Sequence, residues 1–294
     1  MRIRLGTRGS LLARAQSEWF ASRLRAAGHD VEMVLIVTEG DARPPDTTPG
    51  EGIFVAAIAS AVASDEIDAG VHSAKDVPLE EDRGLVIAAY PQRADPRDAL
   101  VTRSGGRSLA TLAAHSLVGT DSPRRAGFVL AARRDLRIVP LHGNVDTRLR
   151  RLDAGEVDAL VIAAAGLDRL GRGDRIDQRI EPNVVTPAPA QGALAVQTRA
   201  SDSRMVELLA AHDQADIRLA VEAERRVLFA TGGTCRAPVG ALAAIEEDGF
   251  TMVVGGVNSD GSDLRVETVH GSRSDATAVA EAAGRRLAGA VMLR

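Results

Sequence analysis

The sequence is poor in three residue types, and each shortage restricts what the protein can be. It contains a single cysteine, Cys235, which excludes an internal disulfide framework and a cysteine-rich metal site. Aromatic residues make up only 2% of the chain, so its cores must be built from alanine, valine, leucine and isoleucine. Lys75 is the only lysine among 36 basic residues. Either this lysine is present by chance in an arginine-rich sequence, or its position needs a compact ammonium group.

Long apolar runs are missing as well. No stretch approaches the ~20 apolar residues that a membrane-spanning helix requires, and the N-terminus lacks the apolar segment of a signal peptide. The net charge of −4 argues against a general nucleic-acid binder. We therefore expect a cytoplasmic protein that binds neither membrane nor nucleic acid, with the two or three domains that 294 residues allow.

Short apolar strands alternate with helical patterns along most of the chain, which favours two parallel α/β sheets. The first set of strands is expected at residues 3–7, 31–37, 67–72 and 85–89, with Ser10 capping the first helix. The second set is expected at residues 99–102, 117–120, 138–141 and 157–162. Near the C-terminus an antiparallel meander is expected at residues 239–244, 250–257 and 264–269, followed by a helix at 276–290.

The lone cysteine lies in an unusual local sequence. Gly232 and Gly233 precede it and Pro238 follows, so Cys235 is expected on a tight exposed loop after a helix at residues 216–230. A thiol there can be a buried apolar filler, a nucleophile or the attachment point of a covalent group. The local sequence leaves these three alternatives open.

Basic residues recur where strands lead into helices. These residues are Arg8, Lys75, Arg124, Arg125, Arg148 and Arg169. Any one of them alone would be read as a solvated surface group, but their shared position predicts a cleft that binds several carboxylates, with phosphates as an alternative. Nucleotides are disfavoured because the sequence has neither a phosphate-binding P-loop nor a well-placed dinucleotide fingerprint.

The remaining polar residues give weaker evidence of a function. Asp76 beside Lys75 is either a surface ion pair or, in a cationic cleft, a group for proton transfer or for stabilising a developing cation. His72 is expected to shape the end of its strand, while His142 stands at a strand end before a glycine. The histidines show no metal-ligand spacing and the serines no triad partners, so neither a metal site nor a serine triad is expected.

Eight motifs, in order along nearly the whole chain, resemble the porphobilinogen deaminase family, also called hydroxymethylbilane synthases. They are Thr7-Arg8-Gly9-Ser10, His72-Ser73-Ala74-Lys75-Asp76-Val77-Pro78, Asp95-Pro96-Arg97-Asp98, Gly119-Thr120-Asp121-Ser122-Pro123-Arg124-Arg125, Gly143-Asn144-Val145-Asp146-Thr147-Arg148, Ala164-Ala165-Gly166-Leu167, Gln191-Gly192-Ala193 and Gly232-Gly233-Thr234-Cys235. The combination of His-Ser-x-Lys-Asp-Val-Pro with a later Gly-Gly-x-Cys is specific to that family.

The resemblance implies a fold and a reaction. Two lobes like those of periplasmic binding proteins are expected, as domain 1 (residues 1–94 and 193–212) and domain 2 (residues 95–192), followed by a small α/β domain 3 (residues 213–294) with a three-stranded antiparallel sheet. The resemblance also implies a monomeric transferase of porphyrin biosynthesis. Such an enzyme joins four porphobilinogen molecules head to tail, with loss of ammonia, and releases a linear tetrapyrrole.

It further implies a role for individual residues. Cys235 would hold a dipyrromethane cofactor through a thioether, Asp76 would be the catalytic carboxylate, and Phe54 would belong to the active-site loop. The acetate and propionate groups of cofactor and substrate would be bound by Arg8, Ser10, Ser73, Lys75, Thr120, Ser122, Arg124, Arg125, His142, Arg148, Arg169 and Gln191.

Three positions depart from the family pattern. His142 stands where the family usually has arginine, Asp121 where it usually has serine, and Glu51 within Pro49-Gly50-Glu51-Gly52 where Gly-Gly-Lys-Gly is common. All three changes would weaken carboxylate binding. The alternatives to a typical member are therefore a diverged paralogue with low or altered activity and a non-catalytic ligand-binding protein on the same scaffold. A pure binder would need neither Cys235 nor Asp76.

Overall fold

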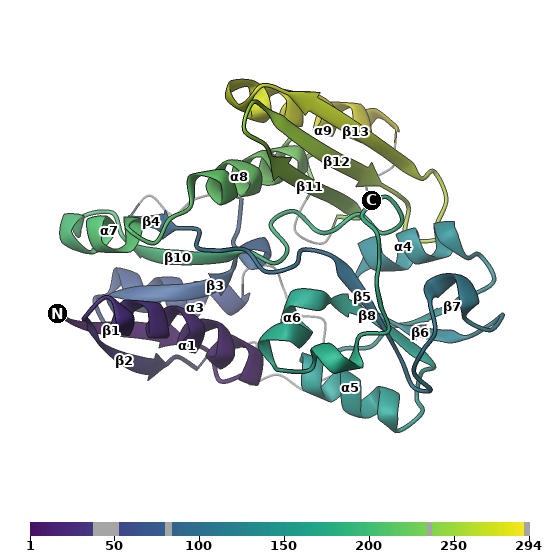
Figure 1. Ribbon diagram of the computed structural model, residues 1–294, viewed down its shortest axis with the longest axis horizontal. Helices are drawn as coiled ribbons and strands as arrows, with labels where there is room; N and C mark the ends of the chain where they lie inside the picture. The colour runs from purple at the N-terminus through teal and green to yellow at the C-terminus, as the bar shows by residue number, and fades with distance from the viewer. Residues whose placement is uncertain (38–52, 80–83, 234–236, 291–294) are drawn as a thin grey trace. The chain divides into compact units, whose positions relative to one another are not determined.

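The computed structural model describes residues 1–37, 53–79, 84–233 and 237–290. The chain divides into two compact units (Figure 1): unit 1 comprises Met1–Arg93 and Ala193–Arg218, and unit 2 comprises Ala94–Gly192 and Leu219–Arg294. The chain therefore passes from one unit to the other three times, after Arg93, Gly192 and Arg218. Each unit is built from segments that are far apart in the sequence.

Unit 1 contains a five-stranded sheet in the order β2-β1-β3-β10-β4. Its strands are β1 (Arg2–Thr7), β2 (Asp30–Leu35), β3 (Ala69–Ser73), β4 (Leu85–Ala89) and β10 (Leu194–Arg199). β1 pairs in parallel with β2 and β3, as the sequence predicted for the opening of the chain. β10 enters from much later in the sequence and lies antiparallel between β3 and β4, so the sheet is mixed.

Helix α1 (Leu11–Ala26) begins where the sequence predicted, because the Ser10 side chain accepts a hydrogen bond from the amide of Ala13. Its residues Phe20 and Leu24 are fully buried and join the core with Ile3 and Leu5 of β1. The remaining helices that begin in this unit are α3 (Ile53–Ala63), α7 (Ser203–Ala210) and α8 (Ala215–Ala230), together with the 3-10 turn η1 (Ala74–Asp76).

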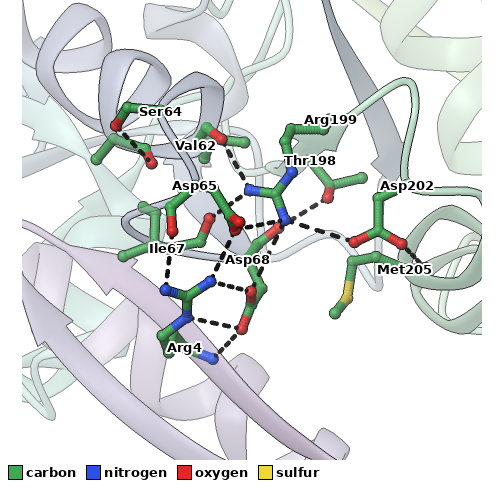
Figure 2. Close-up of polar contacts among 11 residues, drawn as sticks. Arg4, Val62, Ser64, Asp65, Ile67, Asp68, Thr198, Arg199, Asp202 and Met205 are labelled. Carbon is green, nitrogen blue, oxygen red and sulfur yellow. Dashed lines mark hydrogen bonds and ion pairs between the residues drawn. The ribbon is translucent and has the colours of Figure 1, made fainter.

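A network of ion pairs joins β10 to the rest of this sheet at the edge where β1 begins (Figure 2). Arg4 of β1 contacts the carboxylates of Asp65 and Asp68, at 2.8 and 2.7 Å. Arg199, at the end of β10, contacts the same two carboxylates and also that of Asp202, which caps α7. Arg199 further donates to the carbonyls of residues 62 and 67. These contacts hold the end of β10 at the sheet edge where β1 and β3 begin, opposite to the candidate site described below.

Unit 2 contains a second five-stranded sheet, in the order β7-β6-β8-β5-β9. Its strands are β5 (Asp98–Thr102), β6 (Leu117–Gly119), β7 (Arg137–Val139), β8 (Ala159–Ala163) and β9 (Gln178–Arg179). Its helices are α4 (Pro123–Ala132), α5 (Val145–Asp153) and α6 (Ala164–Arg169), with the 3-10 turns η2 (Leu109–Thr111) and η3 (Gly173–Arg175). The short strand β9 was not predicted, because it lies in a proline-rich stretch without strand periodicity.

A three-stranded antiparallel sheet, β11-β12-β13, completes unit 2. It consists of β11 (Val239–Ile245), β12 (Phe250–Gly256) and β13 (Arg265–Gly271), and leads through η4 (Arg273–Asp275) to α9 (Ala276–Ala290). Figure 1 shows α9 lying along this sheet. A Cβ atom at Gly284 of α9 would come within 2.5 Å of the Val227 carbonyl oxygen of α8, so the two helices approach closely there.

The predicted fold class is confirmed: both α/β sheets and the C-terminal antiparallel sheet are present. The expectation that the two α/β sheets are parallel is wrong in part, because β5 runs antiparallel to β8 and β9 in unit 2, as β10 does to its neighbours in unit 1. The division into three domains stays a prediction. None of the helices in the described ranges is both long and apolar enough to span a membrane.

Candidate functional site

The first group of candidate residues follows two neighbouring strands of unit 1. β1 and β3 are parallel and adjacent, so the residues after Thr7 and after Ser73 lie at the same edge of the sheet. Arg8 and Ser10 come from the first strand end, and Ser73, Lys75 and Asp76 from the second. The sequence therefore brings these five residues to one edge, where ligands of open α/β sheets bind.

Asp76 is exposed on a turn whose backbone is fixed. The turn η1 is closed by a hydrogen bond from the amide of Val77 to the carbonyl of Ala74, and the amide of Ala74 donates to the carbonyl of Ala193, which directly precedes β10. Ala74 and Val77 are buried, whereas Lys75 is half-buried and Asp76 is exposed. The packed residues on both sides hold the turn so that the carboxylate of Asp76 faces outward.

Ser73 has a partner that the sequence did not reveal. Gln16, a buried residue of α1, donates a hydrogen bond of 2.9 Å from Nε2 to the Ser73 hydroxyl. This bond fixes the direction of the hydroxyl at the strand end. Its only sequence signal was a glutamine between the apolar positions of the helical pattern.

His72 is structural, as expected. Its ring is buried and its Nε2 lies 3.2 Å from the Gln197 side-chain oxygen of β10. Burial lowers the pKa of His72 to about 4; the Gln197 contact opposes this in part, and the charge of Arg8 adds a smaller lowering. His72 is therefore neutral at physiological pH and is not a proton donor for the site.

In unit 2 the centre of the candidate site is Asp98, which the sequence analysis did not select. Its fully buried carboxylate accepts hydrogen bonds from Arg124 at 2.7 Å, from Arg125 at 2.8 Å and from Gln191 at 3.0 Å. Burial would raise the pKa of Asp98, but the charges of the two arginines outweigh burial and hold it well below its ordinary value. Asp98 is thus an anion that orients two arginines.

This arrangement sets Arg124 and Arg125 apart from the other candidate cations. Both are buried. Arg125 also donates to Gln191, and Arg124 to the carbonyl of Thr186. The same carbonyl lies close to β11, since a Cβ atom at Gly240 would come within 2.4 Å of it. The two arginines are therefore bound inside unit 2 as well as being candidates for ligand binding.

Arg148 and Arg169 differ from Arg124 and Arg125 in the kind of partner that they have. Each donates to a backbone carbonyl, Arg148 to Gly143 at 2.8 Å and Arg169 to Gly192 at 2.7 Å, and neither pairs with a carboxylate in the described part of the chain. Burial lowers the pKa of each to about 10, so each remains protonated near neutral pH at a cost in hydration. A partly buried guanidinium without a counter-ion attracts an anionic ligand.

The hydroxyl candidates Thr120 and Ser122 lie at the start of α4. Ser122 is the N-cap and accepts from the Arg125 amide, while the buried Thr120 accepts from the Ser122 amide at 3.3 Å. Ser122 therefore caps α4, and neither Thr120 nor Asp121 does.

Two departures from the family pattern lie in contact. His142 Nδ1 and Asp121 Oδ1 are 2.9 Å apart, in side chains that are 18% and 17% exposed. The contact has the distance of an ion pair but not the angle of a hydrogen bond, and Nδ1 is buried with no other partner among the described residues. Nδ1 thus faces Asp121, which leaves Nε2 as the ring nitrogen for a ligand.

Three predicted residues lie outside the described part of the chain: Cys235, Glu51 and the side chain of Phe54. Directly before Cys235, the Thr231 hydroxyl donates to the Leu228 carbonyl at 2.7 Å and accepts from the Gly233 amide at 3.2 Å. Gly232 has a φ of +67°, which favours glycine there, as expected for a tight turn. No cluster of three or more His, Cys, Asp or Glu residues suited to a metal ion occurs in the described ranges.

Unit 1 thus carries an exposed carboxylate, Asp76, at a sheet edge, and unit 2 carries Arg148 and Arg169, which pair with no carboxylate among the described residues. These features define a class, an α/β protein with charged residues where its strands end. Residues 3–207 match the family model described as porphobilinogen deaminase, dipyromethane cofactor binding domain. The chain is 50% identical over 253 residues to the porphobilinogen deaminase of Mycolicibacterium gilvum (strain PYR-GCK), which covers 84% of this chain and 81% of that protein. This chain belongs to the porphobilinogen deaminase family.

Further relatives agree. The porphobilinogen deaminase of Mycobacterium tuberculosis (strain ATCC 25618 / H37Rv) is 50% identical over 252 residues, covering 84% of this chain and 81% of that protein. Among solved structures, the methionine-binding protein MetQ is 16% identical with a TM-score of 0.43, covering 76% of this chain and 94% of that one. A periplasmic substrate-binding protein of an ABC transporter from Coxiella burnetii is 16% identical with a TM-score of 0.45, covering 76% and 96%. The family assignment rests on the sequence relatives.

Proposed function

We propose that this chain is a hydroxymethylbilane synthase. Four porphobilinogen molecules and one water molecule give one linear hydroxymethylbilane and four molecules of ammonia. Membership of the family and 50% identity to curated deaminases over 84% of the chain support this activity. The balance of atoms requires no oxidant, reductant or metal.

The observation that carries the proposal is the placement of Asp76. Its carboxylate is exposed on the fixed turn η1, at the same sheet edge as Arg8, Ser73 and Lys75. A carboxylate so placed can accept a pyrrole N–H and stabilise the positive charge that develops as ammonia leaves. Arg8 and Lys75 beside it can bind the acetate and propionate groups of the same pyrrole.

The residues present fit a dipyrromethane cofactor, which carries several carboxylates. Arg148 and Arg169 have no carboxylate partner in the described ranges, and a polycarboxylate would supply one. When bound, the dipyrromethane supplies the primer to which substrate pyrroles are added. Cys235 would hold it through a thioether. Arg125, Thr120, Ser122 and Gln191 would complete the carboxylate contacts, with Ser10 in unit 1.

The proposal also includes the location, the oligomeric state and the domain organisation of the protein. The protein would act as a cytoplasmic monomer, with residues 1–94 and 193–212, 95–192 and 213–294 as three domains. Porphobilinogen is its proposed small-molecule substrate.

The intact mass of the purified protein tests the cofactor. We expect the mass of the chain plus two linked pyrrole units, and the bare chain mass for Cys235→Ser. If the mass stays that of the bare chain after incubation with porphobilinogen and with preformed tetrapyrrole, the proposal is wrong.

Turnover tests the role of Asp76. Asp76→Asn keeps the shape of the side chain but loses its charge, so we expect kcat to fall by about 100-fold or more. Asp30→Asn is the matched control, because Asp30 is an exposed residue at the beginning of β2. Equal kcat values for the two variants would remove Asp76 from the reaction.

A further inference from the structure

The contact between Asp121 and His142 joins two adjacent strands of unit 2. β6 and β7 are parallel, with Gly119 opposite Val139, so their carboxyl ends lie side by side. Asp121 follows the first strand and His142 the second. The two side chains therefore meet at the edge of the sheet that also carries Arg148.

The surrounding charges show what the pair does to this edge. Burial and the charge of Arg125 lower the pKa of Arg148 to about 10, and the charge of Asp121 opposes them, so Asp121 is close enough to act on Arg148. An unpaired carboxylate at this position would repel an anionic ligand that approaches Arg148. His142 is the basic group in contact with Asp121, at 2.9 Å.

We propose that Asp121 and His142 act as one unit that determines how strongly this edge binds a pyrrole carboxylate. His142, whose Nδ1 lies against Asp121, shields that carboxylate from the ligand and presents Nε2 to it. Arg148 then meets the ligand without competition from Asp121. The inference rests on the proposed function, since it takes porphobilinogen as the ligand.

A double-mutant cycle tests the unit. His142→Ala leaves Asp121 unpaired, so we expect KM for porphobilinogen to rise about 10-fold with a smaller change in kcat. Adding Asp121→Ser removes the repelling charge, so the double variant should bind more tightly than His142→Ala alone, by about 5-fold. Asp121→Ser alone should change KM by less than His142→Ala does.

The matched control removes an acidic charge elsewhere in unit 2. Glu156→Ser breaks an exposed ion pair with Arg151, so in the His142→Ala background it should not restore KM. Urea midpoints of the four proteins of the cycle show independently whether the two side chains are coupled. If the effects on KM are additive, or if Glu156→Ser restores KM equally well, the unit does not exist.

The proposed function can fail separately. If the wild-type protein binds porphobilinogen without turnover, the dissociation constant measured by calorimetry replaces KM in the same cycle. If the wild-type protein converts porphobilinogen but the two substitutions have additive effects on KM, only the inference about Asp121 and His142 is wrong. A wild-type protein that neither binds nor converts porphobilinogen overturns both.

Discussion

At the scale of single residues, the candidate arginines differ in the partner that each already has. Arg124 is buried and bonded to Asp98, whereas Arg148 is partly buried and bonded only to a backbone carbonyl among the described residues. Removing Arg124 leaves the buried carboxylate of Asp98 with one positively charged partner fewer. Removing Arg148 takes away a cation that pairs with no carboxylate among the described residues. The same substitution should therefore have opposite consequences at these two positions.

We predict that Arg124→Gln lowers the free energy of unfolding by about 3–5 kcal/mol, because Asp98 loses a buried partner. Arg148→Gln should leave that free energy unchanged or slightly higher and should raise KM for porphobilinogen roughly 10-fold or more, the value of about one charged hydrogen bond. Urea unfolding and steady-state kinetics of both variants measure this. Equal losses of stability would show that Arg148 is also structural.

His72 predicts a pH dependence of stability. Its pKa is lowered from 6.5 to about 4 by burial in the folded protein, so between these pH values the unfolded chain takes up a proton that the folded protein does not. The stabilisation is complete above pH 6.5 and is lost as the pH falls towards 4. The loss amounts to as much as roughly 3 kcal/mol.

His72→Gln should remove this fall. Its free energy of unfolding, measured in urea from pH 7 to 4, should decline less steeply than that of the wild type. His270→Gln, at an exposed position of β13, is the control and should follow the wild-type curve. A wild-type slope retained in His72→Gln would mean that His72 titrates normally in the folded protein.

At the scale of elements, helix α9 contains two glycines with different surroundings. A Cβ atom at Gly284 would meet the carbonyl of Val227 and the Cβ of Ala230 in α8, whereas at Gly289 it would meet nothing within 4 Å. Gly284 therefore lets α9 approach the end of α8, which precedes Cys235 in the sequence. Gly289 costs the helix conformational freedom without a packing benefit.

We predict opposite signs for the same substitution in this helix. Gly284→Ala should destabilise the protein by about 1–3 kcal/mol through overpacking, and Gly289→Ala should stabilise it by about 0.5 kcal/mol. Thermal unfolding of the two variants measures both. A stabilising Gly284→Ala would show that α9 can move away from α8 at no cost.

The sequence predicted most elements because their signals are local. Ser10, Ser122 and the glycines before Cys235 act on their own neighbours, and the strand and helix patterns held within a few residues. Contacts between distant elements were not predictable in this way. Asp98 was missed because its role exists only once Arg124, Arg125 and Gln191 converge on it from other segments. The contact of Asp121 with His142 depends likewise on the pairing of two strands.

At the scale of the whole molecule, each unit has its own hydrophobic core. Phe20 is buried in the core of unit 1, and Phe128 in a core of unit 2. A cavity in one core should therefore weaken mainly the unit that contains it. Three chain crossings link the units covalently, but they do not merge these cores.

Hydrogen exchange measured peptide by peptide tests this separation. Phe128→Ala should cost about 3–5 kcal/mol and should speed exchange in β5, β6 and β8 much more than in β1 and β3. Phe20→Ala should produce the reverse pattern. If either variant speeds exchange equally in both sets of strands, the molecule opens as one cooperative block.

The position of β10 also sets an order of events on the ribosome. Strands β5 to β9 lie within residues 98–179, so every strand of the second sheet has been synthesised before Leu194. The first sheet cannot be completed until β10 has been made, because β10 is the strand that pairs with both β3 and β4. During that interval the nascent chain carries β3 and β4 with open, unpaired edges, which are prone to aggregate. The N-terminal sheet is therefore the later of the two to close, and slow translation between residues 180 and 199 would prolong its exposure.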